Sequence, residues 1–269
     1  MIFIPLHIGA LCLYLLSAVL YGANLSTRVR SHLFLARMFY SAGLVLHTAA
    51  IGSFCLAAHL SPFTGGFGSL SVFAWAAALL FLPIEVKFNL PALGALAAPA
   101  GSLLLFFAML RSRVAIRMNP HIHERIISLH VMLALFAFAL FLIAAVCAAG
   151  WLWQYRLLKH PDKRGLFRKL PPLETLDGLA FKLVAFAMPL LTLALALGIV
   201  RAAEGALRPG WMTDMHTLVS MIAWIIYGIY MAARRLAGWR GSRLQYLLIT
   251  GLAVSLLLLF VPGVSHRFG

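Results

Sequence analysis

The chain has 269 residues, of which 63% are hydrophobic and only 11% are charged. Soluble globular domains carry about 25% charged residues, so this composition excludes an ordinary soluble protein. The formal net charge of +15 does not indicate nucleic acid as a partner, because the Lys and Arg residues lie in short segments between apolar runs. The composition therefore favours an integral membrane protein.

Eight apolar segments follow one another along the chain. Their length, without strict alternation of polar and apolar residues, is typical of membrane-spanning helices. The third segment is short, and Pro99 predicts a kink in the fourth. We therefore expect an all-α integral membrane protein, with residues 1–269 forming a single polytopic domain. The predicted helices cover residues 2–23, 37–59, 70–84, 90–110, 126–149, 179–200, 216–233 and 244–262.

The distribution of positive charge favours one orientation. Segments 24–36, 150–178 and 234–243 hold most of the Lys and Arg residues, which places them in the cytoplasm and both termini on the outer, periplasmic side. The stretch "RSRVAIRMNPHIHER" then carries four arginines on the outer side, against the rule. Two explanations stay open: a miscounted or re-entrant third segment, or arginines that bind an anionic ligand. We expect a multi-pass protein of the bacterial inner membrane, in contact with membrane lipids.

Several histidines gather on the outer side in this orientation. His130 lies about one turn inside the fifth segment, where an unpaired polar ring costs free energy. His266 follows the last segment on the same side, while His121 and His123 are typical of an interface. Two imidazoles from different helices can ligate a haem iron, and neutral imidazole also suits zinc and copper. His130 and His266 are therefore the candidate metal ligands.

The surrounding residue types favour haem over zinc. A porphyrin needs an aromatic wall and cations for its propionates, and Trp75, Trp211, Arg117 and Arg125 are predicted on the outer side. A structural zinc site uses four protein ligands, often cysteines, and all three cysteines lie inside apolar runs. From the residues alone, haem, another metal and no cofactor all stay open.

The order and spacing of several stretches resemble a known family. They include "GLVLHTAAIG", "SLHVMLALFAFALFLIAAVCAAGWLWQYRLLK" and "WMTDMHTLVSMIAWIIYGIY". The chain resembles the cytochrome c assembly superfamily of haem-handling membrane proteins (CcsA, CcmC, CcmF), and within it the short HemX-like and YpjD-like branch. The resemblance implies haem b at the outer surface, with His130 and His266 as its ligands. It also implies that His47 matches a histidine used deeper in the membrane.

The tryptophan-rich haem motif of that family is only partly present. The family pattern is similar to W-x-W-D-P-K-E-x-W, whereas this chain has "WMTDMHTLV". Trp211 and Asp214 are kept, and Thr213, Met215 and His216 replace the second tryptophan, the proline and the lysine. Further along, Ala232 stands where the family has a second deep histidine, so His47 lacks its expected partner.

These observations predict a haem-binding inner-membrane protein of haem handling or cytochrome c biogenesis. Because the tryptophan motif is degenerate and the extra domains of a synthase are not found in this sequence, we expect no enzymatic activity. One alternative is a non-catalytic scaffold or regulator of a haem-biosynthetic enzyme, with assembly components or that enzyme as partner. A permease is less favoured, since few charges lie in the apolar segments. The residues expected around the haem are Trp211, Asp214, His216, Trp75, Arg117, Arg125 and His47.

Overall fold

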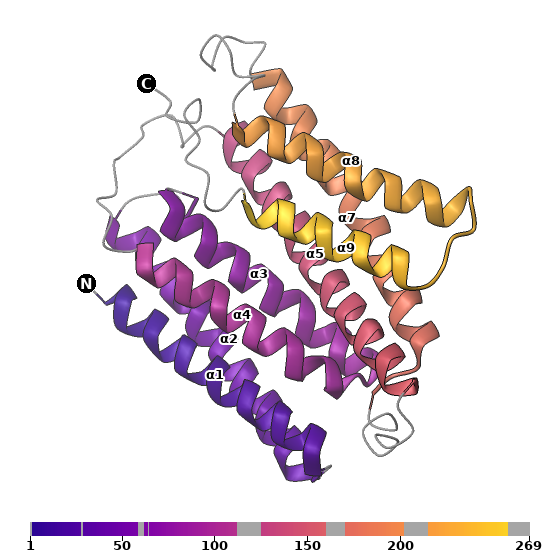
Figure 1. The fold of residues 1–269 in the computed structure, drawn as a ribbon. Helices are drawn as coiled ribbons and strands as arrows, with labels where there is room; N and C mark the ends of the chain where they lie inside the picture. Colours follow the sequence, from indigo (N-terminus) through magenta and orange to yellow (C-terminus); the bar gives the residue numbers. More distant parts are fainter. Residues whose placement is uncertain are drawn as a thin grey trace.

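The structure, a computed structural model, describes residues 2–27, 29–58, 62–63, 65–111, 125–159, 170–201 and 215–257. This described part contains eight helices and no strand (Figure 1). Seven of them are long and apolar enough to cross a membrane, and α9 has 16 described residues. The all-α membrane fold is therefore confirmed. The helices are α1 (Phe3–Thr27), α2 (Arg30–Ala58), α3 (Gly65–Phe88), α4 (Pro91–Arg111), α5 (Arg125–Leu158), α7 (Leu173–Arg201), α8 (Met215–Arg235) and α9 (Ser242–Leu257).

The helices extend beyond the apolar runs that predicted them. α2 begins at Arg30 and α7 at Leu173, several residues before the predicted starts at 37 and 179. A helix satisfies its own backbone, so it continues into polar flanks that hydropathy leaves out. The third segment was predicted to be short; this is wrong, because α3 has 24 residues and is long enough to cross a membrane. The two explanations of the outer arginines both stay predictions.

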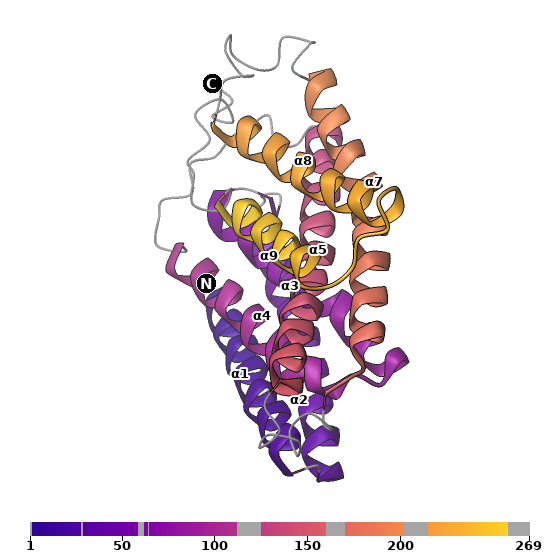
Figure 2. The same ribbon diagram turned by 45° about the vertical axis from the view of Figure 1, so that its right-hand side comes forward.

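The helices form two halves with the same order of packing. In the first half, α1 packs on α2 and α4, and α3 packs on α4 and more lightly on α2. In the second half, α5 packs on α7 and α9, and α8 packs on α9 and more lightly on α7. Figures 1 and 2 show α1–α4 on one side and α7–α9 on the other, with α5 between them. α5 also packs on α3 and α4, so it joins the halves.

One interhelical hydrogen bond recurs in both halves. The indole Nε1 of Trp75 on α3 donates to Thr48 Oγ1 on α2 over 2.9 Å. The indole Nε1 of Trp224 on α8 donates to Thr192 Oγ1 on α7 over 3.0 Å. Because the same bond occurs in both halves, Thr48 of α2 corresponds to Thr192 of α7, and Trp75 of α3 corresponds to Trp224 of α8.

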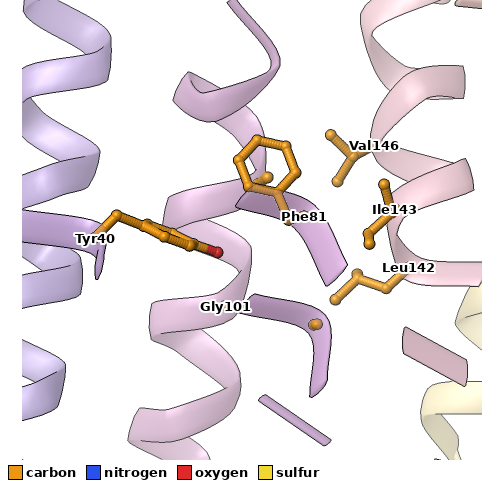
Figure 3. Close-up of a pocket in the computed structure, with 8 residues that line it drawn as sticks. Tyr40, Phe81, Gly101, Leu142, Ile143 and Val146 are labelled. Carbon is orange, nitrogen blue, oxygen red and sulfur yellow. The ribbon is translucent and has the colours of Figure 1, made fainter. Parts of the chain in front are cut away.

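A small cavity lies where the two halves meet. It is lined by residues of α2, α3, α4 and α5, and Figure 3 shows Tyr40 and Phe81 facing Leu142 and Ile143 across it. Its volume is about 10 Å³, which is room for about one water molecule. The lining is almost wholly apolar, so this cavity is a packing gap and does not accommodate a cofactor.

Candidate cofactor-binding site

His130 lies near the start of α5 and is half-buried against α7. Its Nδ1 lies 2.6 Å from the carbonyl oxygen of Ala194. Because a carbonyl can only accept a hydrogen bond, Nδ1 carries the proton, and Nε2 of the neutral ring keeps its lone pair. Histidines that ligate metals use their second ring nitrogen in this way, as a donor to a carbonyl or carboxylate. The His130 ring is thus oriented with Nε2 as the atom that could ligate a metal, and no hydrogen bond to Nε2 comes from the residues that the structure describes.

A glycine on α7 makes room for this ring. Gly198 follows Ala194 by four residues, so both lie on the face of α7 that meets α5. A Cβ atom at position 198 would lie 3.1 Å from His130 Cε1 and 3.3 Å from its Nδ1. The Ala194 carbonyl and the missing side chain at Gly198 together fix where the imidazole sits.

Trp75 is half-buried on α3, at the junction with α2 and α5. Its indole N–H is used by Thr48, and its ring meets Phe136 of α5 edge-on, with centroids 6.2 Å apart and planes at 83°. Phe136 follows His130 by six residues on the same helix. The contact fixes the ring of Trp75 beside the helix that carries His130, and its role against a cofactor stays a prediction.

The other predicted site residues are not all described. Arg125 is the first residue of α5, and His216 lies in the first turn of α8. The structure describes the backbone of these two residues but not their side chains. The predicted ligand His266 and three of its companions lie outside the described residues altogether. These companions are Arg117, Trp211 and Asp214.

His47 has polar partners that the sequence analysis did not identify. Its imidazole is fully buried, and its Nε2 lies 3.0 Å from Ser71 Oγ on α3. Ser71 Oγ is also 2.9 Å from Nε2 of His7 on α1, and the two imidazole centroids are 5.4 Å apart. His7 was missed because it resembles a lone histidine near a helix end. One signal was present: Phe3, His7, Ala10, Tyr14, Ser17 and Tyr21 form one buried stripe of α1 at helical spacing.

The fold and the oriented histidine define a polytopic, all-helical membrane protein with an imidazole near one end of its bundle. The chain belongs to the cytochrome C assembly protein family, whose model matches residues 63–266. It is 25% identical to the cytochrome c biogenesis protein CcsA of Guillardia theta over 226 residues, covering 77% of this chain and 75% of that protein. It is 26% identical to CcsA of Synechococcus sp. (strain WH7803) over 263 residues, covering 85% and 80%.

A relative with a different name matches a shorter stretch. The chain is 27% identical to protein HemX of Brevibacillus brevis over 169 residues, covering 62% of each chain. The match therefore spans less than two thirds of that relative. Similarity to both CcsA and HemX agrees with the resemblance found in the sequence.

Proposed function

We propose that the chain is a haem-binding membrane protein with a role in cytochrome c biogenesis. The family match and the CcsA and HemX relatives support the role in biogenesis. The observation that carries haem binding is the His130 imidazole, whose Nδ1–H is held by the Ala194 carbonyl and whose Nε2 is thereby available to a metal. In this proposal the cofactor is haem b, and His130 and His266 would hold its iron.

The remaining predicted residues have supporting roles in this proposal. A bound haem would supply an iron that imidazole nitrogens can ligate. Arg117 and Arg125 neutralise the propionates, and Trp75 forms part of the wall beside α5. In this proposal Trp211, Asp214 and His216 would contact the porphyrin, and His47 would act deeper in the bundle. None of these roles requires a bond to be made or broken, so we propose a protein that carries or presents haem and has no enzymatic activity.

The setting of this function is also part of the proposal. We place the protein in a bacterial inner membrane, with both termini and His130 on the outer side. Membrane lipids surround the bundle, and cytochrome c assembly components or a haem-biosynthetic enzyme are its partners.

An absorption spectrum tests haem binding directly. The protein purified in detergent, with haem added, is expected to show a Soret band and the sharp visible bands of a low-spin, bis-imidazole iron. His130→Gly should lose the low-spin bands, and free imidazole should restore them by occupying the vacated ligand position. His266→Ala should also alter the low-spin bands.

A matched histidine controls for general damage. His32, whose Nδ1 lies 3.0 Å from Thr27 Oγ1 at the other end of α1 and α2, can be replaced by alanine without touching α5. His32→Ala should keep the wild-type spectrum. The absence of a Soret band in the wild-type protein after haem addition, or an unchanged spectrum in His130→Gly, would overturn the proposal in favour of a scaffold without cofactor.

A further inference from the structure

The turn that joins α8 to α9 is strongly basic. Residues 234–243 read "RRLAGWRGSR", with four arginines, no lysine and no acidic residue. Figure 1 shows this turn at the right of the bundle, between the ends of α8 and α9. Because apolar helices end near the boundary of the hydrocarbon layer, the turn lies at the level of the lipid headgroups. We call residues 234–243 the arginine turn.

The backbone of the arginine turn has a defined conformation. The N–H of Leu236 donates to the Ala232 carbonyl over 2.8 Å, and the N–H of Trp239 donates to the Ala233 carbonyl over 3.0 Å. These bonds satisfy carbonyls at the end of α8 that have no partner further along the helix. Gly238 has a φ of 62°, which glycine adopts without strain. The arginines on both sides are therefore attached to a fixed backbone.

The corresponding turn of the first half is shorter and carries less charge. α3 ends at Phe88 and α4 begins at Pro91, whereas α8 ends at Arg235 and α9 begins at Ser242. The first turn reads "EVKFNLP", with one lysine and one glutamate. Joining the third helix of a half to the fourth therefore does not require the arginines. Orientation in the membrane requires only positive charge, which lysine also supplies, so the repeated use of arginine indicates a further role.

Two exposed apolar side chains lie among the arginines. Leu236 is 87% exposed and Trp239 is 50% exposed. Leu236 continues the face of α8 on which Ile225 and Ile229 are exposed, because these positions are spaced by four and seven residues. Tryptophan is enriched at the level of the headgroups. The two side chains are therefore placed to contact lipid chains just below the headgroups.

Most of the arginines of the turn point outward. Arg234 is used by Asp177. The other three arginines are exposed, and they are Arg235, Arg240 and Arg243. The guanidinium carbon of Arg235 lies 5.5 Å from the centre of the Phe181 ring, which holds this side chain beside α7. A planar guanidinium binds phosphate through two parallel hydrogen bonds, whereas a lysine ammonium acts as a point charge. The exposed arginines therefore match a phosphate group.

We propose that the arginine turn binds an anionic phospholipid at the membrane surface. Arg235, Arg240 and Arg243 donate hydrogen bonds to the phosphate oxygens, and Leu236 and Trp239 contact the adjoining part of the acyl chains. A lipid with net negative charge is preferred to a zwitterionic one, because the turn has no carboxylate to balance a choline or ethanolamine cation. The exposed apolar pair favours a lipid over free phosphate, which has no apolar part to contact it.

Quenching of tryptophan fluorescence by brominated lipid tests the site. We would reconstitute the haem-free full chain in nanodiscs of phosphatidylcholine with a minor share of phosphatidylglycerol. Bromine is placed near the headgroup end of the acyl chains of one lipid or the other, at equal mole fraction. The difference between wild type and Trp239→Phe isolates the signal of Trp239, which brominated phosphatidylglycerol should quench more strongly. In the triple variant Arg235→Gln/Arg240→Gln/Arg243→Gln this preference should fall at least about fivefold, because each cation near the surface contributes about that factor.

Lys87→Gln is the matched control, because it removes a cation from the corresponding turn of the first half and should keep the preference. Inorganic phosphate, compared with chloride at equal ionic strength, should not displace the lipid. Equal quenching of Trp239 by the two lipids, or an unchanged preference in the triple variant, would overturn the proposal. A loss in Lys87→Gln as large as in the triple variant, or release of the lipid by inorganic phosphate, would overturn it as well. Because no haem is present, each result leaves the haem proposal untouched.

Discussion

The two halves of the bundle have the same order of helix packing, but they bury a histidine to different extents near the end where α1 and α5 begin. In the first half the histidine of the leading helix, His7, is fully buried and bonded through both ring nitrogens. In the second half the corresponding helix carries His130, which is half-buried and bonded to α7 through Nδ1. The same helix packing thus encloses one imidazole completely and the other only in part.

A single position explains much of this difference. The Thr48–Thr192 correspondence matches Phe54 of α2 with Gly198 of α7. Phe54 is buried and packs its ring against those of Phe3 and Phe67, with centroids 5.3 and 5.5 Å away. Gly198 provides no side chain, and the His130 ring takes the space. A large residue fills this position in the first half, and its absence leaves room for the His130 ring in the second.

Far from the histidines, both halves join their second and third helices with an ion pair of opposite polarity. Arg37 of α2 meets Glu85 of α3, with Nη2 2.8 Å from Oε1 and Nε 3.0 Å from Oε2. In the second half Asp177 of α7 meets Arg234 of α8 at 2.6 Å, and Gln245 of α9 donates to the same aspartate over 2.9 Å. The shared helix packing therefore places an ion pair between the second and third helices of each half, but either of the two helices can carry the acidic residue.

The largest expected effect comes from removing one partner of these pairs. Arg37→Ala leaves the fully buried Glu85 carboxylate without its counter-charge, and we expect a loss of about 3 kcal/mol in the free energy of unfolding. Arg234→Ala should cost less, because Gln245 still donates to Asp177. Unfolding by SDS titration in mixed micelles measures both losses.

A charge exchange sharpens this prediction. The double variant Arg37→Glu/Glu85→Arg gives the first half the polarity of the second, and it should recover most of the stability lost in Arg37→Ala. If the double variant is no more stable than the single one, the two ion pairs are not equivalent parts of a shared frame.

Replacing a tightly packed glycine of α4 or of α9, the last helix of each half, should give the next largest loss of stability. A Cβ at Gly94 of α4 would collide with the ring of Tyr21, and one at Gly251 of α9 would lie 2.8 Å from Tyr227 Cζ. Overpacking costs about 1–3 kcal/mol, which exceeds the helix preference for alanine of about 1 kcal/mol. Gly94→Ala and Gly251→Ala should therefore both lower the unfolding midpoint.

Gly101→Ala on α4 is the matched control. A Cβ at this position has no neighbour within 4 Å, so the helix preference should dominate and the midpoint should rise or stay unchanged. A fall as large as that of Gly94→Ala would show that the close approach to Tyr21 is not the cause.

The helices themselves could be predicted from the sequence, because long apolar runs have one solution in a membrane. Their ends could not, since Arg30 and Leu173 lie in polar or mixed flanks where hydropathy falls although the helix continues. The family and the choice of His130 followed from ordered motifs. Whether His130 and His266 ligate one iron stays a prediction, because His266 lies outside the described residues.

Contacts between distant segments were beyond the sequence analysis. Ser71 is 64 residues from His7 and 24 from His47, and no spacing within one helix indicates that it joins them. The correspondence of the halves was hidden for a similar reason. It rests on interhelical pairs such as Trp75 with Thr48, and few residues are identical between the halves. Packing creates these relations, so they become visible only in the fold.

Adding a methyl group beside His130 tests whether Gly198 makes room for the imidazole. In Gly198→Ala the new methyl group would press on the imidazole, so the ring must shift by a few tenths of an ångström or weaken its bond to Ala194. If the haem proposal holds, the haem dissociation rate should rise about fivefold and the low-spin bands should shift. Gly178→Ala, on the same helix but with no neighbour within 4 Å, should behave as wild type. If the two variants behave identically, the missing side chain at Gly198 does not control how His130 binds haem.

The smallest effect should come from the hydrogen bond that both halves share. Thr48→Val and Thr192→Val keep the side-chain shape but remove the acceptor of the Trp75 and Trp224 indoles. Each loss should cost about 1 kcal/mol of unfolding free energy and shift tryptophan emission to shorter wavelength. Because the bonds occupy corresponding places, the two variants should agree within about 0.5 kcal/mol and their double variant should be additive. A Thr48→Val cost several times that of Thr192→Val would mean that the Trp75 bond also supports something the second half lacks, and the hydrogen bonds of His47 and His7 to Ser71 would be the first to measure.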